Sequence, residues 1–179
     1  YLNWANEVYK PTYITQHTLN LTGGSEVGRY LVSFDYLVQP GLVKNTEYQR
    51  YTYRVNTDLN IGKMLKVSSD VTYRHVDRLW PESLGSVQYD VWSMQPTSPV
   101  RYENGDYRLD KQNRNAISLM DLDVVGEDRY NMDVVYGQVK ADFEPIKDLV
   151  FTGMASLNGS WDRSKIHYKN YKYYNETGE

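Results

Sequence analysis

The sequence predicts an all-β fold, namely an antiparallel transmembrane β-barrel fragment of about six strands with one long extracellular loop. Polar and apolar residues alternate with a period of two over segments longer than the ~5–6 residues of an ordinary soluble strand. Short turns and longer loops alternate along the chain, as they do in outer-membrane barrels. Tyrosine is abundant, with 18 Tyr against 3 Phe among 179 residues. This side chain suits positions that are apolar on one side and wet on the other.

The composition excludes several classes of protein. A formal net charge of −3, from 20 Lys and Arg against 23 Asp and Glu, excludes a strongly basic nucleic-acid-binding surface. The absence of cysteine excludes a disulfide scaffold, a cysteine-ligated zinc site and a thiol nucleophile. The sequence contains no run of about 18 apolar residues, so no transmembrane helix is predicted. Neither end of the chain carries a targeting signal or completes a structural unit, and we therefore expect a piece of a larger protein.

Four strands are predicted in the first half of the chain. They are Thr15–Gly23, Gly28–Val38, Gln49–Ile61 and Leu65–Arg74. The third is the most regular, because apolar residues from Tyr51 to Ile61 alternate with polar residues from Arg50 to Asn60. Its length matches the ~9–11 residues that a strand needs to cross a bilayer at a tilt.

Two further strands, Val135–Phe143 and Leu149–Asp162, follow a region in which the alternation stops. Short turns are expected at 24–27, 62–64 and 144–148, and longer loops at 39–48 and 77–129. The expected organisation is an extracellular loop end (1–14), four antiparallel barrel strands (15–76), a long extracellular loop with a short helix and a hairpin (77–130), two barrel strands (131–163) and the start of the next extracellular loop (164–179).

The charged residues of the strands predict which face meets water. Arg50, Arg54, Asp58, Asp70 and Arg74 share the polar parity, which suits a wet lumen. On a lipid-exposed face each Arg or Lys would cost ~2–4 kcal/mol at the midplane. A soluble antiparallel sheet with one solvated face is the alternative that the pattern leaves open. Six strands would leave open edges, which lipid does not tolerate, so a barrel requires further strands.

Two elements are expected within the long loop. A short helix is predicted over Ser83–Met94, with Val87, Val91 and Met94 on one face and Pro96 beyond its end. Asn104-Gly105 predicts a tight hairpin between Val100–Tyr102 and Tyr107–Leu109.

Three ordered stretches resemble the barrel of SusC/RagA-type TonB-dependent outer-membrane transporters. The first stretch is Trp4–Val8, followed by the strand His17–Gly24. The second is Tyr36–Val43 with Tyr48–Asn56, which together form a strand, a loop and a returning strand rich in Arg and Tyr. The third is the Pro-Thr-x-Pro-Val segment 96–100, which continues into Asn104–Tyr107 and Asn115–Leu119. The resemblance covers nearly the whole chain. The family's plug domain and TonB box are not found in it.

The resemblance implies a larger barrel of about 22 strands with a plugged lumen. It also implies energised import of oligosaccharides or oligopeptides across the outer membrane of a Gram-negative bacterium. The implied partners are a SusD-like surface lipoprotein, the TonB complex, outer-membrane lipid and the oligosaccharide or peptide substrate. Transport, without enzymatic activity and without a cofactor, is the implied function.

Candidate substrate-binding residues come from the long loop and from the strand ends near it. Trp80, Tyr89, Trp92, Tyr102 and Tyr107 could stack on sugar rings or peptide side chains, and Arg74 and Asp162 lie on the lumen parity near the predicted outer strand ends. Packing of these aromatic residues within the loop is the alternative. No catalytic residues are expected, because no nucleophile–base or carboxylate pair has a recognisable setting.

A calcium site is a further alternative for the long loop. Asp121 and Asp123 resemble the start of an EF-hand, but Val125 and Met132 stand where the motif needs oxygen ligands, so an EF-hand is rejected. A looser site could use Asp121, Asp123, Glu127 and Asp128. The histidines are too far apart in sequence to form a metal motif, and no other metal site is expected.

Two functional alternatives remain open, a soluble all-β carbohydrate-binding module and a passive porin. The segment Ile166–Tyr174 interleaves basic and aromatic residues. It fits either nucleic-acid binding or a strand extension within a tyrosine girdle. The net charge favours the strand extension, and no nucleic-acid partner is expected.

Overall fold

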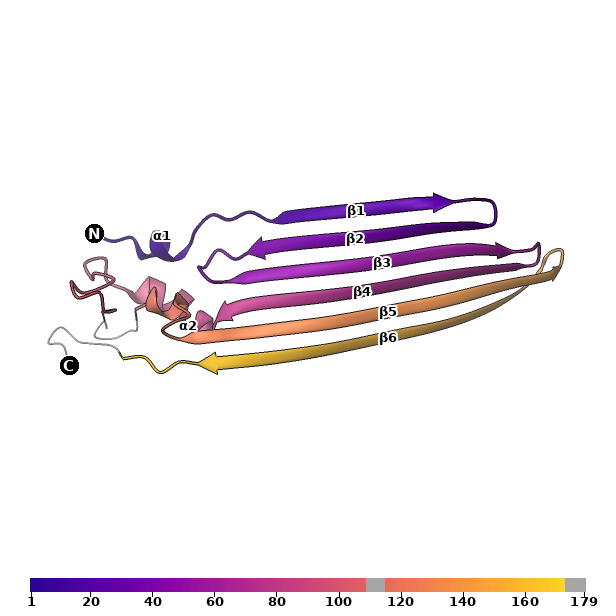
Figure 1. Cartoon of the computed structure of the whole chain (residues 1–179). Coiled ribbons are helices and arrows are strands. Elements are labelled where there is room, and N and C mark those ends of the chain that lie inside the picture. The colour runs from indigo at the N-terminus through magenta and orange to yellow at the C-terminus, as the bar shows by residue number, and fades with distance from the viewer. Residues whose placement is uncertain (109–114, 173–179) are drawn as a thin grey trace.

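A computed structural model describes residues 1–108 and 115–172, and it consists of one antiparallel sheet with a small helical region at one end (Figure 1). The six strands follow one another in the order β1-β2-β3-β4-β5-β6, each paired with its sequence neighbours. The elements are α1 (Trp4–Val8), β1 (Thr15–Gly24), β2 (Gly28–Pro40), β3 (Glu47–Ile61), β4 (Leu65–Pro81), α2 (Leu84–Ser93), the 3-10 helix η1 (Ser118–Met120), β5 (Gly126–Ile146) and β6 (Leu149–Tyr168). The predicted all-β, antiparallel fold class is confirmed.

The strands that flank the long loop extend beyond their predicted ends. β4 continues to Pro81 and β5 begins at Gly126, so the predicted loop boundaries at 77 and 130 are corrected to 82 and 125. β6 likewise continues to Tyr168 instead of ending near 163. The alternation disappears near these ends because both faces carry polar side chains there, while the backbone pairing continues. Arg78, for example, still pairs with Tyr48 and Tyr130.

All three short turns lie at one end of the sheet, and the long connections, α1 and α2 lie at the other end (Figure 1). The turn between β3 and β4 uses Gly62 with φ +65°, a left-handed conformation that glycine adopts without steric cost. Both ends of the described chain also lie at the loop end (Figure 1). The structure therefore has the predicted arrangement, with short turns at one end of the sheet and longer loops at the other.

The register separates the residues into two faces. One row across all six strands consists of Leu21, Val32, Val55, Val71, Gly137 and Leu157. The adjacent row, on the opposite face, consists of Asn20, Ser33, Arg54, Thr72, Tyr136 and Asn158. We call the face of the first row the apolar face and that of the second row the polar face.

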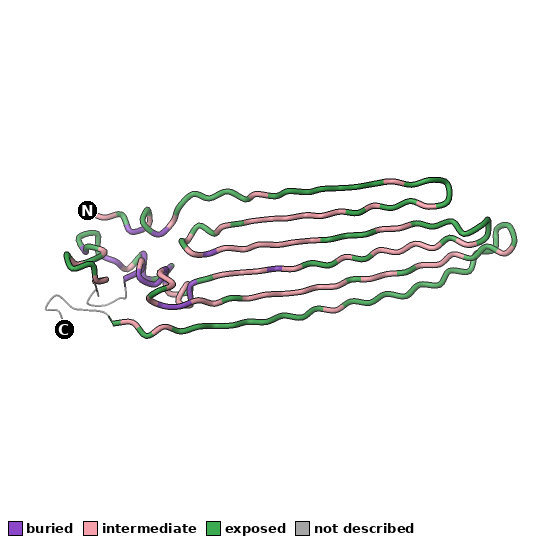
Figure 2. The backbone as a smooth tube through the Cα atoms, in the orientation of Figure 1, coloured by how far each residue is buried: buried purple, intermediate pink, exposed green. Residues whose placement is uncertain are grey.

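No core lies under the apolar face within the described residues, and its side chains remain open. Val55 is 40% exposed and Leu157 is 69% exposed. A soluble sheet would instead bury this face against another layer. Buried residues concentrate at the loop end, while the strands are mostly half-buried or exposed (Figure 2).

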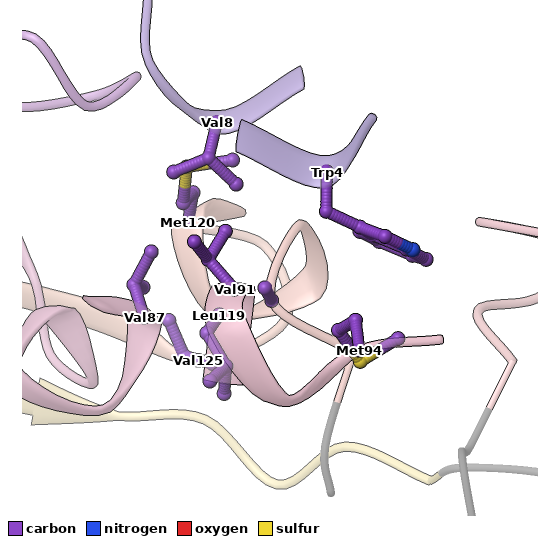
Figure 3. Packing of buried hydrophobic residues seen from close by; sticks show 9 residues of the cluster. Trp4, Val8, Val87, Val91, Met94, Leu119, Met120 and Val125 are labelled. Carbon is purple, nitrogen blue, oxygen red and sulfur yellow. The ribbon is translucent and has the colours of Figure 1, made fainter. Parts of the chain in front are cut away.

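The main hydrophobic core joins the loop segments to one another (Figure 3). We call it the cap core, and it consists of Trp4, Val8, Val87, Val91, Met94, Ala116, Leu119, Met120 and Val125. The predicted loop helix is confirmed as α2, whose Val87 and Val91 enter this core together with Met94 just beyond its end. No helix in the described residues is long and apolar enough to span a membrane.

Hydrogen bonds connect segments of the cap core that lie far apart in sequence. The Trp4 Nε1–H donates to the carbonyl oxygen of Gln95 at 3.0 Å. Asn115 is fully buried; its Nδ2 donates to the Val100 carbonyl at 2.6 Å, and its Oδ1 accepts from the Ile117 N–H at 3.0 Å. The segment 1–14, predicted as the end of an extracellular loop, contains the helix α1. The sequence did not predict this helix, because five residues are too few to show a helical period.

Candidate functional site

A row of tyrosines marks the end of the apolar face nearest the loops. The rings of Tyr36 and Tyr51 stack 4.7 Å apart, and those of Tyr53 and Tyr73 stack 6.1 Å apart. Tyr51 and Ile61, near the two ends of the apolar band, are ten residue steps apart on β3. At ~3.4 Å per residue and a tilt of ~40°, that distance spans ~25 Å, the height of the apolar band in outer-membrane barrels.

Charged side chains lie on the same face just beyond the tyrosine row. Asp133 Oδ1 accepts hydrogen bonds from the Tyr73 hydroxyl and from His75 Nδ1, both at 2.7 Å. Arg163 pairs with the other carboxylate oxygen at 3.3 Å. The apolar face therefore changes to a polar surface within one or two residues of the tyrosines.

The polar face carries ion pairs along the strands. Arg50 pairs with Asp35 at 3.2 Å and Arg54 pairs with Asp70 at 2.6 Å. The predicted lumen row, Arg50, Arg54, Asp58, Asp70 and Arg74, does share this face. Because these pairs are partly exposed, we expect each to contribute little to stability.

A pocket of about 580 Å³ lies where the polar face meets the loops, and we call it the mouth pocket. Its residues come from the start of the chain, the β2–β3 connection, the end of β4 and α2. Its apolar lining is Tyr9, Leu42, Val43, Tyr48, Trp80, Leu84 and Val87, and its polar lining includes Gln39, Thr46, Glu47 and Gln88.

Trp80 is the only predicted aromatic contact residue that lines the mouth pocket. It is 37% exposed, and the guanidinium carbon of Arg78 lies 3.8 Å from the centre of its ring. Arg78 in turn pairs with Asp128 at 3.3 Å. Sequence reasoning missed Tyr48 and Leu84. Tyr48 could have been predicted from the sequence, because it lies two residues before Arg50 on the same face of the strand, nearer to the loops.

The other predicted aromatic residues lie elsewhere in the loop region. Tyr89 and Trp92 are 70% and 74% exposed on α2, and neither belongs to the cap core. Tyr102 and Tyr107 belong to the predicted hairpin, in which Arg101 pairs with Tyr107 and Gly105 has φ +91°. The predicted end of that hairpin, Leu109, lies outside the described residues.

Tyr107 packs within the loop. Its hydroxyl donates to Asp121 Oδ2 at 2.8 Å, and the guanidinium carbon of Arg101 lies 3.6 Å from its ring centre. Burial, followed by the hydrogen bond to the Asp121 carboxylate, raises the pKa of Tyr107 to about 12. These contacts favour the alternative in which this aromatic residue holds the loop together.

Arg74 and Asp162 lie on the polar face but do not contact each other. Arg74 pairs across the sheet with Val134, and Asp162 pairs with Met132, two residues further along β5. Neither lies at a strand end, because β4 and β6 both continue further. Six residue steps separate Arg74 from Trp80, so the predicted site residues are dispersed along this face.

The four acidic residues of the calcium alternative have four different partners. Tyr107 donates to Asp121, Lys169 pairs with Asp123 at 2.9 Å, Arg129 pairs with Glu127 at 3.4 Å, and Arg78 pairs with Asp128. The hydrogen bond and charge of Lys169 lower the pKa of Asp123. Residues 1–108 and 115–172 hold no group of three side chains suited to a metal ion. Each of the four carboxylates thus has a hydrogen-bond or ion-pair partner within the chain.

The basic and aromatic segment Ile166–Tyr174 begins as a strand. Ile166, His167 and Tyr168 continue β6, in agreement with a strand extension. Lys169 then pairs with Asp123. The end of the segment, Tyr173 and Tyr174, lies outside the described residues.

Comparison with curated proteins identifies relatives that are named TonB-dependent receptors. Over 106 residues the chain is 30% identical to the TonB-dependent receptor P26 of Formosa agariphila, a match that covers 59% of this chain and 10% of that protein. Over 69 residues it is 35% identical to the TonB-dependent receptor P3 of the same organism, covering 38% of this chain and 7% of that protein. No protein-family model matches the chain.

Comparison with solved structures shows that the fold is similar to part of the RagAB transporter. A structure of the RagAB peptide transporter matches 91% of this chain and 19% of its own chain, with a TM-score of 0.73 and 19% identity. A structure of the RagAB peptide importer in its closed-closed state has a TM-score of 0.71 and 20% identity. The chain spans no more than about a fifth of any of these proteins.

The expected resemblance is confirmed: in sequence this chain is similar to part of TonB-dependent receptors, and in fold it is similar to part of the RagAB transporter. These relatives are receptors and transporters and not enzymes, which agrees with the expected absence of enzymatic activity.

Proposed function

We propose that this chain is part of an outer-membrane active transporter of a Gram-negative bacterium that imports oligosaccharides or oligopeptides. In this proposal the transporter is energised through TonB and works with a SusD-like surface lipoprotein. The observation that carries the proposal is the two-faced sheet, in which an apolar band ends at a row of tyrosines and a charged wall occupies the opposite face. The similarity to TonB-dependent receptors supports the choice of transporter class.

In the proposed barrel each face of the sheet has one role. The apolar face, with Val55 at its centre, contacts the hydrocarbon of the outer membrane, and the tyrosine row lies at the outer headgroup level. The polar face, with Arg54 and Asp70, lines the hydrated lumen. The open edges of β1 and β6 pair with further strands, because lipid does not tolerate unpaired backbone groups.

The loop end faces the cell exterior in this proposal. The cap core holds the long loop and α1 in one packed unit above the strand ends. The mouth pocket opens where substrate would pass from the loops to the lumen wall. A surface lipoprotein would meet this same end of the barrel.

Membrane fractionation with electrophoresis of the outer-membrane band, boiled and unboiled, tests the barrel. We expect a heat-modifiable band several times larger than the 21.0 kDa of this chain. A soluble species of unchanged mobility would contradict the proposal and favour a soluble carbohydrate-binding module. Uptake that persists after the proton-motive force is dissipated would favour a passive porin.

A further inference from the structure

The two ends of the apolar face differ in charge. Toward the turns, the described strand residues on this face carry no charge, and they include Leu59, Leu65, Phe143 and Phe151. Beyond the tyrosine row, at the loop end, β5 and β6 place three cations on the same face, namely Arg129, Arg163 and Lys165. In the proposed barrel this end faces the cell exterior, so the cations lie on the outer side of the lipid-facing wall.

Arg129 and Lys165 lie directly opposite each other in the antiparallel pair of β5 and β6. Like charges at such positions are destabilising. Arg129 forms one ion pair, with Glu127 at 3.4 Å, and the two side chains are 47% and 37% exposed. Lys165 forms no ion pair or hydrogen bond with any residue of 1–108 and 115–172. An anionic group between the two cations would relieve their repulsion and give Lys165 a partner.

The other acidic side chains on this face do not supply that group. The carboxylate of Asp133 is engaged by the three donors described above. Asp77 lies on β4 and Glu47 on β3, which are two and three strands away from Lys165 on β6. At ~4.8 Å between neighbouring strands, these separations are ~10 and ~14 Å. The positive charge therefore concentrates on the β5–β6 side of the face.

The height of these cations above the apolar band corresponds to lipid headgroups. Trp161 lies in the same cross-strand row as Tyr51, and it extends the tyrosine row onto β6. Lys165 lies four residue steps further on β6, ~10 Å along the membrane normal at ~3.4 Å per residue and a tilt of ~40°. The headgroup layer extends ~5–8 Å beyond the hydrocarbon, and the flexible stem of a lysine lets its ammonium reach back into that layer. On a lipid-facing wall, the anion within reach is one that a lipid carries.

We propose that Arg129 and Lys165, assisted by Arg163, bind the phosphorylated headgroup of an outer-leaflet lipid on the outside of the barrel. A phosphate group offers several acceptor oxygens, so it can accept hydrogen bonds from a guanidinium and an ammonium at once. The inference rests on the proposed function, because it requires the apolar face in the membrane and the loop end outside. It goes beyond that function, because the ligand is a lipid on the outer wall and not a substrate in the lumen.

Native mass spectrometry of the purified, delipidated full-length protein tests the site with two lipids that differ in one group. Monophosphoryl lipid A carries the phosphate, and the same lipid after enzymatic dephosphorylation has identical acyl chains without it. We expect the phosphorylated lipid to bind at least about fivefold more tightly, which corresponds to the attraction of one cation to an anionic lipid surface. An excess of inorganic phosphate should not displace it, because free phosphate gains nothing from the apolar face.

Variants at position 165 test whether the charge must face the lipid. Lys165→Ser should lower the affinity for the phosphorylated lipid about fivefold and leave that for the dephosphorylated lipid unchanged, whereas Lys165→Arg should retain both. Ser164→Lys combined with Lys165→Ser keeps the composition and net charge but moves the cation to the polar face, so it should lose as much affinity as Lys165→Ser alone. Lys63→Gln, in the β3–β4 turn at the opposite end of the sheet, should have no effect. The heat-modifiable band of each variant confirms that it has folded.

Other results would overturn the inference without affecting the transport proposal. Equal binding of the two lipids would overturn it, as would unchanged binding of the phosphorylated lipid by Lys165→Ser. Displacement by inorganic phosphate would mean that the site takes free phosphate and not a lipid. Full affinity in the variant that exchanges residues 164 and 165 would mean that net charge, and not this site, attracts the lipid. A full-length protein that is neither heat-modifiable nor in the outer membrane would instead refute the proposed function itself.

Discussion

Arg54 donates a hydrogen bond to Asp70 across 2.6 Å on the polar face, while Val55, the next residue, lies between Val32 and Val71 on the apolar face. One residue step thus separates a charged pair from an entirely apolar row. This relationship follows from the period of two in β3, and it determines how substitutions at neighbouring positions should differ.

The first prediction concerns Val55 and Asn56, which are adjacent in sequence and lie on opposite faces. Val55→Arg in the full-length protein should prevent stable assembly, because an arginine near the centre of a lipid-facing band costs ~2–4 kcal/mol. Asn56→Arg should be tolerated, since Asp70 lies directly across from it on the polar face. The heat-modifiable band measures assembly, and equal tolerance of both changes would contradict a membrane strand.

The second prediction concerns the stability that the Arg54–Asp70 pair supplies. Side-chain exposures of 50% and 29% leave the pair screened by water. We therefore expect a coupling energy below ~1 kcal/mol in a double-mutant cycle of Arg54→Ala and Asp70→Ala. Thermal unfolding of the four proteins provides the measurement. A coupling of several kcal/mol would show that this wall is dry and not hydrated.

The third prediction concerns Asn115, which is fully buried and connects the Val100 carbonyl with the Ile117 N–H. Asn115→Ala should loosen the cap core by ~1–3 kcal/mol, because buried backbone groups lose their partners. Hydrogen exchange of residues 84–93 should accelerate while exchange of the strands stays unchanged. Asn6→Ala, an exposed asparagine on α1, is the matched control and should have little effect. Equal protection in both variants would contradict this role.

The fourth prediction concerns the pH dependence of the loop around Tyr107. Its pKa is about 12 in the folded loop, against an ordinary value of 10, because burial and the Asp121 carboxylate disfavour the phenolate. A raised pKa means that the stabilisation is complete below pH 10 and is lost as the pH rises from 10 through about 12. Tyrosinate absorbance and proteolysis of the hairpin should both follow this range. In Tyr107→Phe the hairpin should be more susceptible at neutral pH, and its loosening between pH 10 and 12 should disappear.

Several features could be predicted from the sequence because they depend on neighbouring residues alone. The alternation from Tyr51 to Ile61 determines both the strand and its two faces, and the spacing of Val87, Val91 and Met94 determines the buried side of α2. The turn at Gly62 and the hairpin at Gly105 follow from local backbone preference. The ends of β4 and β5 could not be predicted in the same way, because their pairing continues after the alternation ceases.

The sequence by itself determined a two-faced antiparallel sheet, since a strand's side chains alternate whatever surrounds them. Only the tertiary structure decided which loop residues meet. Trp4 joins Gln95, and Tyr48, Trp80 and Leu84 line one pocket, although they come from segments far apart in the chain. It also directed Tyr107 into the loop and Trp80 toward the pocket, two aromatic residues that the sequence treats alike. These contacts depend on strand register and loop packing, which no local sequence pattern predicts.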